Sequence, residues 1–455
     1  MTKTPLLDGL MKYNKEKILR FHMPGHYGKM PAQYEKLYQN LFALDVTEVD
    51  GTDNLAEPMG IILESLERIA KIYGAKKSYF LVNGSTSGIH IAMDALIPEG
   101  KTVIVGRNSH KSIRNLIRKK SLDAVYIYPR TDELFGVDSH IELQDVIAAI
   151  EQASDVRAVV LTYPNYYGRA YDLKSIYDYL QSKKIPLIVD SAHGASFAFS
   201  KELPDSAVLH SDICIHSLHK TLPAFTQTSL LHIGENLSEA QIEKVEENLR
   251  FYLSSSPSYL LMASAELAVS MMEECGEAEL LRLKKLYERA CEKLESEDVL
   301  VYKNALGQDF CKLFVKTPLG KEAAQILRRE YRIQCEMVVD DSLLFMLGTA
   351  HSEEDIDYLT DSILDAIRKY GKKSSLKPMI FLPKMEKVNR ERMEDCKNRS
   401  ISVVDVSESI GLVIAEDIVP YPPGIPVVME YEEMNEQAAQ LLQRLGINKI
   451  KCFTK

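Results

Sequence analysis

The sequence contains no apolar run long enough to cross a membrane, and its N-terminus has no apolar core of signal-peptide length. It also has no internal repeat and no low-complexity tract. Hydrophobic residues make up 45% of the chain and charged residues 26%, which is typical of globular proteins that bury large cores. We therefore expect a soluble, cytoplasmic protein with no membrane partner. A length of 455 residues favours two or three domains.

The sequence also lacks the cysteine and charge patterns of several protein classes. None of its seven cysteines has C-x-x-C spacing to another, and the odd number argues against a disulfide framework. We expect reduced thiols and no metal site. Lys and Arg number 55 against 65 Asp and Glu, a formal net charge of −10, so a general nucleic-acid partner has no electrostatic support.

Short apolar runs alternate with helical segments between about residues 46 and 235. Ile62, Leu66, Ile69 and Tyr73 recur at helical spacing, and further helices are expected at 139–152 and 172–182. This alternation predicts an α/β fold, with a mostly parallel sheet covered by helices on both faces. The expected strands are 78–82, 102–106, 123–128, 156–162, 186–190, 212–217 and 228–233.

The segments around this sheet suggest further units. Long helices are expected at 257–297, and a smaller α/β unit follows, in which a strand is expected at 333–338. The charged and small residues at 369–378 are typical of a linker. The sequence therefore predicts four parts, which are an N-terminal arm at 1–45, a large domain with bridging helices at 46–297, a small α/β domain at 298–370 and a C-terminal domain at 371–455.

A lysine follows the strand at 212–217, in the segment Ser217-Leu218-His219-Lys220-Thr221. Open α/β sheets place their ligands at the carboxyl ends of strands. A single lysine is most often a solvated surface amine, but Ser217 and His219 are two residues apart and lie on one side of an extended segment. These side chains can hold a phosphate while Lys220 reaches an aldehyde, provided that the pKa of the lysine is lowered.

A carboxylate, Asp190, ends the strand at 186–190, thirty residues before Lys220. It suits a partner for the protonated pyridine nitrogen of pyridoxal 5'-phosphate (PLP), because the opposite charge keeps the proton in place. The alternative interpretation is a carboxylate that caps the following turn.

A turn of small residues, Asn83-Gly84-Ser85-Thr86-Ser87-Gly88, lies between a strand and a helix. Backbone amides at a helix N-terminus favour an anion, and the three hydroxyl groups add donors. The G-K-[ST] ending of a Walker loop is absent. An ordinary N-cap turn is the alternative.

A histidine, His110, follows the strand at 102–106 in the segment RNSHKS. Its imidazole could lie flat against a pyridine ring. A histidine that only forms structural hydrogen bonds is the alternative, and the interpretation as a ring partner depends on the other motifs.

These motifs occur in the order found in fold-type I PLP enzymes: first the phosphate turn, then the stacking residue, the Asp and the Lys. Seven segments closely resemble the bacterial ornithine/lysine/arginine decarboxylase family: FHMPGH (21–26), GTDNLAEPMG (51–60), RNSHKS (107–112), DSAHGASF (190–197), SLHKTLPAFTQ (217–227), SSSPSYLLMASAE (254–266) and PYPPGIPV (420–427). The resemblance runs from about residue 4 to about 430. It is strongest to the short subgroup without the N-terminal wing domain, whose best-known activity is arginine decarboxylation.

The resemblance implies roles for individual residues. Lys220 is similar to the Schiff-base lysine, Asp190 to the partner of the pyridine nitrogen, and His110 to the residue stacked on the ring. Ala192 would lie under the ring and His193 beside it. His110 and Lys220 would be the proton donors.

The resemblance also implies phosphate ligands and a homodimer with composite active sites. Ser254 and Ser256 are similar to positions that reach the phosphate of the neighbouring subunit. The phosphate ligands within the chain would be Ser85, Thr86, Ser217 and His219, and Ser87 is a further candidate from the same turn.

The expected reaction is decarboxylation of a basic amino acid, arginine before lysine or ornithine, to the amine and CO2. An aminotransferase or aldolase on the same scaffold and a non-catalytic regulatory homologue are the alternatives. Asp53 and Glu57 are candidates for binding the distal cation of the substrate, although both also suit a helix cap.

Overall fold

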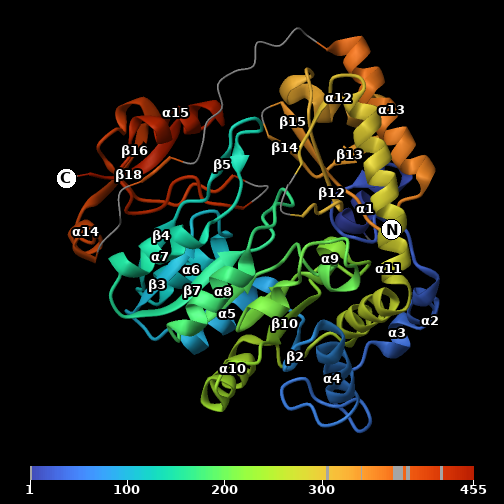
Figure 1. Cartoon of the computed structure of the whole chain (residues 1–455), viewed down its shortest axis with the longest axis horizontal. Coiled ribbons are helices and arrows are strands. Elements are labelled where there is room, and N and C mark those ends of the chain that lie inside the picture. The colour runs from blue at the N-terminus through green and yellow to red at the C-terminus, as the bar shows by residue number, and fades with distance from the viewer. Residues whose placement is uncertain are drawn as a thin grey trace.

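The computed structural model describes residues 3–303, 307–339, 341–371, 383–385, 390–420 and 424–454. Its largest sheet has seven strands in the order β2-β10-β9-β8-β7-β3-β4 (Figure 1). Strand β10 is antiparallel to both neighbours, and the other pairs are parallel. The strands are β2 (Lys77–Leu81), β3 (Thr102–Gly106), β4 (Asp123–Ile127), β7 (Val156–Thr162), β8 (Leu187–Asp190), β9 (Ile213–His216) and β10 (Ser229–Ile233).

Helices cover both faces of this sheet, so the predicted α/β class is confirmed. Alternate residues of the buried strands enter two different cores: Val103 and Val105 belong to one, and Ile104 belongs to the other. The helices on the face of Val103 are α5 (Ser85–Leu96), α6 (Lys111–Lys119) and α10 (Glu239–Tyr252). Those on the face of Ile104 are α4 (Ile61–Tyr73), α7 (Leu143–Gln152) and α8 (Leu173–Ser182).

A single helix of 37 residues, α11 (Tyr259–Glu295), runs from the large sheet to a smaller unit (Figure 1). The smaller unit has an antiparallel sheet in the order β11-β12-β15-β14, with α13 packed against α11. None of the helices among the described residues is long and apolar enough to cross a membrane. The elements of this unit are β11 (Leu300–Val301), β12 (Lys312–Lys316), α12 (Ala323–Glu330), β14 (Met337–Val339), β15 (Ser342–Met346) and α13 (Glu353–Tyr370).

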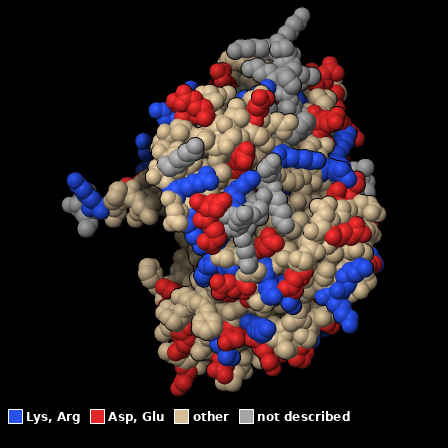
Figure 2. All heavy atoms as spheres, turned by 90° about the vertical axis from the view of Figure 1, so that its left-hand side faces the viewer, with Lys and Arg blue, Asp and Glu red and all other residues tan. Residues whose placement is uncertain are grey.

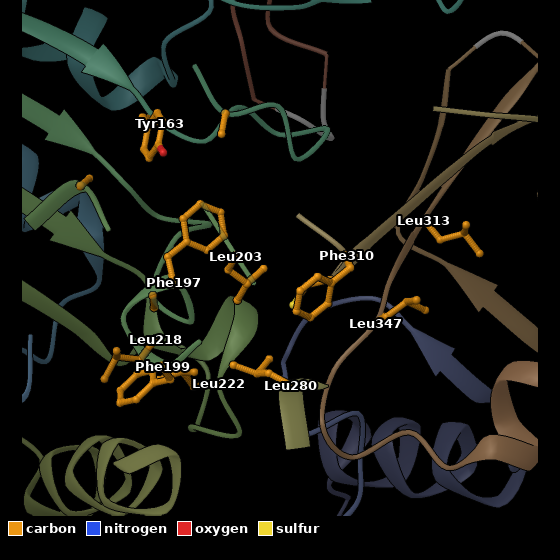
Figure 3. Close-up of a cluster of buried hydrophobic side chains, with 14 of the residues drawn as sticks. Tyr163, Phe197, Phe199, Leu203, Leu218, Leu222, Leu280, Phe310, Leu313 and Leu347 are labelled. Carbon is orange, nitrogen blue, oxygen red and sulfur yellow. The ribbon is translucent and has the colours of Figure 1, made fainter. Parts of the chain in front are cut away.

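The two units share one hydrophobic core. Phe197 and Leu203 of the large unit and Phe310 and Leu313 of the small unit belong to the same buried cluster (Figure 3). Strand β12 is therefore held directly against the large unit.

The N-terminal arm is attached to the small unit. The expected strand at 333–338 is split, because β13 (Ile333–Cys335) leaves the small sheet and pairs in parallel with β1 (Leu19–Phe21) of the arm. The arm also carries α1 (Pro5–Lys15), α2 (Glu35–Gln39) and α3 (Leu41–Leu44).

The C-terminal unit has a three-stranded antiparallel sheet and its own core, which includes Ile414, Val428 and Leu442. Most of the expected linker at 369–378 and three residues of PYPPGIPV, 421–423, lie outside the described residues. On the face drawn in Figure 2, basic and acidic side chains are interspersed. The elements are α14 (Arg390–Cys396), β16 (Ser400–Asp405), β17 (Val413–Ile414), α15 (Glu436–Arg444) and β18 (Lys449–Thr454).

Candidate active site

A cavity of about 900 Å³ lies at the carboxyl ends of β7, β8 and β9. Thr162 and Asp190, the last residues of β7 and β8, line it together with Ser217, which follows β9. Residues of the arm, the small unit and the C-terminal unit complete its wall. The cavity is therefore at the position where open α/β sheets bind ligands.

Most of the site residues expected from the sequence meet in this cavity. Those that line it are Ser85, Thr86, His110, Asp190, Ala192, His193, Ser217, His219 and Lys220. Three expected residues are elsewhere. Ser87 donates its hydroxyl to the carbonyl of Gly84 at 2.7 Å, within the turn. Ser254 and Ser256 are exposed between α10 and α11, outside the lining of the cavity.

Lys220 lies on the short helix α9 (Leu218–Thr221), which begins directly after Ser217. Burial lowers the pKa of its amine to about 8, although the carboxylate of Asp190 acts in the opposite direction. Its Nζ lies 3.1 Å from Nε2 of His193. A larger fraction of this amine is uncharged at neutral pH than in an exposed lysine, as a nucleophile requires.

Asp190 is only 4% exposed, and one carboxylate oxygen accepts a hydrogen bond of 3.2 Å from the amide of Ala192. Burial raises the pKa of this carboxyl group, and the charge of Lys220 opposes that effect. A buried carboxylate of this kind is stabilised by a cation that enters the cavity.

The turn before α5 suits an anion. Gly84 has a φ of +78° at the N-cap position, and α5 has no side-chain cap. The hydroxyl of Ser217 donates to the hydroxyl of Ser85 at 2.8 Å, so β9 and α5 bring their donors together. The amides of the first turn can hold a phosphate group.

His219 would bind an anion differently in its two protonation states. Its Nδ1 lies 2.9 Å from the carbonyl of Thr228, which requires a proton on Nδ1 and makes Nε2 of the neutral ring an acceptor. Burial lowers the pKa of His219 to about 4. The side chain can bind a phosphate as the imidazolium, or by accepting a proton from a phosphate oxygen.

His110 is held from two directions. Its Nδ1 accepts a hydrogen bond of 3.2 Å from the amide of Ser112, so Nε2 carries the proton of the neutral ring. Burial lowers its pKa to about 4, and Lys220 contributes to this effect. The amide of the next residue, Lys111, donates at 3.0 Å to the carbonyl of Gly424, which fixes the loop to the C-terminal unit.

Residues far apart in the sequence also line the cavity, and no sequence motif predicted them. Glu336 accepts a hydrogen bond of 3.0 Å from the amide of Met23 and another from the hydroxyl of Tyr166. A single acidic residue in an apolar segment forms no motif, so only its polarity could have drawn attention to it. The other missed residues of the arm and of the small and C-terminal units are Tyr13, His22, Pro24, Gln334, Cys335 and Ile425.

Asp53 and Glu57, the two residues expected to bind the distal cation of the substrate, do not line this cavity of the single chain. The carboxylate of Asp53 accepts hydrogen bonds from four backbone amides, including those of Met59 and Ile62. Against the effect of burial, these bonds lower the pKa of Asp53 to about 2. Asp53 thus acts as a cap at the start of α4, and Glu57 is exposed.

The fold is shared with solved enzymes. The lysine decarboxylase LdcF of Francisella novicida has a TM-score of 0.76 at 19% identity, over 98% of this chain and 83% of that one. The ureidoglycine-glyoxylate aminotransferase of Bacillus subtilis has a TM-score of 0.62 at 13% identity, over 83% and 97%. At these identities the comparison establishes the fold, which is that of fold-type I PLP enzymes, and leaves the reaction open.

Sequence comparisons identify nearer relatives. The uncharacterized protein YaaO of Bacillus subtilis is 31% identical, over 97% of this chain and 94% of its own length. The arginine decarboxylase of the same organism is 28% identical, over 96% and 92%. The family profiles "Orn/Lys/Arg decarboxylase, major domain" and "Orn/Lys/Arg decarboxylase, C-terminal domain" match residues 4–301 and 373–449. The chain therefore belongs to the Orn/Lys/Arg decarboxylase family.

Proposed function

We propose that the protein is a PLP-dependent decarboxylase that converts a basic amino acid, arginine in preference to lysine or ornithine, to the amine and CO2. The observation that carries the proposal is Lys220, an amine with a pKa lowered to about 8 inside a cavity that also contains Asp190. Family membership supports the reaction. Relatives named arginine decarboxylase, matched over most of the chain, support the preference for arginine.

The residues of the cavity fit PLP. The amine of Lys220 would hold the cofactor aldehyde covalently, and the buried carboxylate of Asp190 would keep the proton on the ring nitrogen by its opposite charge. The hydroxyls of Ser85, Thr86 and Ser217 and the first amides of α5 would hold the phosphate. The bound cofactor supplies a ring that takes up the electron pair left when a bond to Cα breaks.

The chain itself supplies the proton donors and part of an apolar wall. His110 carries its ring proton on Nε2 because Nδ1 accepts from Ser112, so Nε2–H is a donor on the cavity side of the loop. The amine of Lys220 is the second donor. Pro24 of the arm and Ile425 of the C-terminal unit add apolar atoms to the wall of the cavity, and an apolar wall strengthens electrostatic interactions inside it.

Glu336 suits the distal cation of the substrate. Among the described residues that line the cavity, the carboxylates are Asp190 and Glu336. Asp190 is assigned to the ring nitrogen, which leaves Glu336 for a guanidinium or ammonium group. The hydroxyl of Tyr166 and the amide of Met23 orient its two oxygens.

A homodimer with composite sites is part of the proposal. Several large apolar side chains of the arm and one in the last turn of α10 are exposed in the single chain, including Phe42 at 99% and Phe251 at 76%. Apolar groups exposed to this extent favour burial against a second copy. Ser254 and Ser256 lie next to Phe251 in the sequence and would then reach the phosphate of the neighbouring site.

The division into parts at 1–45, 46–297, 298–370 and 371–455 also remains a proposal. A cytoplasmic location is supported by the cysteines, all seven of which are free thiols.

The test is incubation of the protein and PLP with arginine, lysine and ornithine in turn, with CO2 and the amine product measured. Agmatine and CO2 from arginine at the highest rate are expected. A keto acid without CO2 would identify an aminotransferase, and a colourless, inactive protein would identify a non-catalytic homologue. Lys220→Ala should abolish turnover and the absorbance of the lysine-bound cofactor, and decarboxylation by that variant would refute the assignment.

A further inference from the structure

A second lysine reaches the site from the small unit. Lys312 of β12 is only 1% exposed, and its Nζ lies 2.9 Å from Nδ1 of His193. The other ring nitrogen of His193, Nε2, lies 3.1 Å from Nζ of Lys220. One imidazole ring therefore lies between two lysine amines that belong to different units of the chain.

This arrangement constrains the protonation states of all three groups. Burial lowers the pKa of His193 far below its ordinary value, and the two lysines lower it further, so the ring is neutral. A neutral imidazole donates from one nitrogen and accepts at the other, whereas an ammonium group only donates. Both contacts are hydrogen bonds only if one of the two lysines is an uncharged amine.

Lys220 must be the uncharged lysine when it reacts, because the free amine is the nucleophile. Asp309 is fully buried near Lys312, and the charge of that lysine opposes the rise that burial causes in the pKa of Asp309. The pKa of Lys220 is lowered to about 8. When Lys220 is the uncharged partner, Nδ1 of His193 accepts from Lys312 and Nε2–H donates to the amine of Lys220.

We propose that Lys312 is a positioning residue for the reaction at Lys220, which it serves by fixing the tautomer of His193 and by placing a second positive charge beside the amine of Lys220. This inference rests on the proposed function, because it concerns the group that would hold the cofactor. Lys312 acts through His193 and touches neither the substrate nor the cofactor in this assignment.

The other groups around Lys220 explain why such a residue is needed. The carboxylates of Asp190, at the end of β8, and Glu336, between β13 and β14, both favour the charged form of Lys220. His110, before α6, and His219, on α9, have pKa values near 4 and are neutral at physiological pH. The positive charge of Lys312 opposes the two carboxylates.

The fold holds Lys312 in place. Its neighbours Phe310 and Leu313 are part of the core shared by the two units (Figure 3). Gly168 lies directly against its aliphatic stem: a Cβ at that position would lie 2.9 Å from Cγ of Lys312. The φ of Gly168 is +85°, so two separate features require glycine beside this lysine.

The test measures the pKa of Lys220 directly, on the full chain stripped of cofactor. The rate of reductive methylation of Lys220 is followed against pH by peptide mass spectrometry, in the parent chain, in Lys312→Met and in Lys316→Met. Lys316 is a matched control, because it is a buried lysine on the same strand that donates instead to the carbonyl of Leu134 at 2.9 Å.

In Lys312→Met the midpoint of Lys220 methylation should rise by about one pH unit, which corresponds to about a tenfold slower reaction at pH 7. Lys316→Met should leave the midpoint unchanged. An unchanged midpoint in a folded Lys312→Met chain, or equal shifts in both variants, would overturn the proposal.

Removing Lys312 takes away a positive charge that acts on the buried carboxylate of Asp309, and the variant fails to fold if this cost exceeds the stability of the chain. In that case the double variant Asp309→Asn/Lys312→Met, which also removes the carboxylate, is measured against the same criteria. Methylation requires no turnover, so a chain that releases no CO2 from any amino acid would refute the proposed function and still give a result for Lys312.

Discussion

The backbone amide of Gly25 donates a hydrogen bond of 2.6 Å to the carbonyl oxygen of His219. This bond joins the N-terminal arm to the turn that carries Lys220. A Cβ at position 25 would lie 2.4 Å from the carbonyl oxygen of Leu222, so a larger residue cannot enter without a shift of the backbone. The arm is therefore part of the active-site architecture.

We expect Gly25→Ala to displace the arm from the lysine turn. The overpacking should cost about 1–3 kcal/mol of stability and lower the rate of decarboxylation, because the position of Lys220 depends on this turn. Thermal unfolding and CO2 release measure the two effects. Gly9→Ala is the control, because a Cβ at Gly9 meets nothing within 4 Å. Equal activity in both variants would show that the contact has no role in catalysis.

A buried ion pair fixes the C-terminal unit to the loop of His110. The side chains of Arg107 and Glu432 are 1% and 2% exposed, and Arg107 also donates to the carbonyl of Pro426 at 2.6 Å. Arg107→Met should lower stability by about 3–5 kcal/mol, because the charge of Glu432 is then uncompensated. The urea midpoint measures this loss.

The double variant Arg107→Met/Glu432→Gln separates the pair from the rest of the packing. It should recover part of the lost stability, since no charge remains buried without a partner. A double variant that is as unstable as the sum of the two single variants would contradict the ion-pair explanation.

Much of the fold was predictable from local patterns. The strands at 102–106 and 156–162 have the predicted bounds, because parallel strands buried on both faces form continuous apolar runs. The prediction of one continuous strand at 333–338 was wrong, because the segment forms two strands, β13 and β14. Its apolar pattern does not change at Glu336, where the chain leaves one sheet and enters another. The partner of the first half, β1, lies about three hundred residues earlier and leaves no local signal.

The residues of the candidate site were also only partly predictable from local sequence patterns. Lys220 and Asp190 follow apolar strands in short motifs, so the residues at the carboxyl edge of the sheet could be found from the sequence. Lys312 and Glu336 come from the small unit and meet these residues only through the packing of two units. For Lys312, the available signal in the sequence was a lysine in the otherwise apolar strand at 312–316.

The pKa of Lys220 makes cofactor uptake dependent on pH. The reacting form is the uncharged amine, so the rate of uptake by the stripped chain should fall about tenfold per pH unit below pH 8. Asp190→Asn removes a charge that raises the pKa of Lys220, so the midpoint should move to lower pH. Stopped-flow absorbance between pH 6 and pH 9 measures the rate of cofactor uptake in the parent chain and in Asp190→Asn. A midpoint that moves to higher pH in this variant would contradict the electrostatic account.

Glu336 should control recognition of the distal cation. Glu336→Gln keeps the shape of the side chain but removes the charge: its amide oxygen can still accept from Met23, and its NH2 group can donate to the hydroxyl of Tyr166. Because an ionic hydrogen bond contributes about 1.5–3 kcal/mol, KM for arginine should rise about tenfold or more, while kcat changes less. Asp53→Asn is the comparison, because Asp53 is the candidate expected from the sequence but caps α4 and lies outside the cavity of its own chain. A normal KM for arginine in Glu336→Gln, or an equal rise in Asp53→Asn, would assign the distal cation to another group. Because the carboxylate of Glu336 would distinguish a charged from a neutral end of the substrate's side chain, Glu336→Gln should also lose its preference for arginine over norleucine.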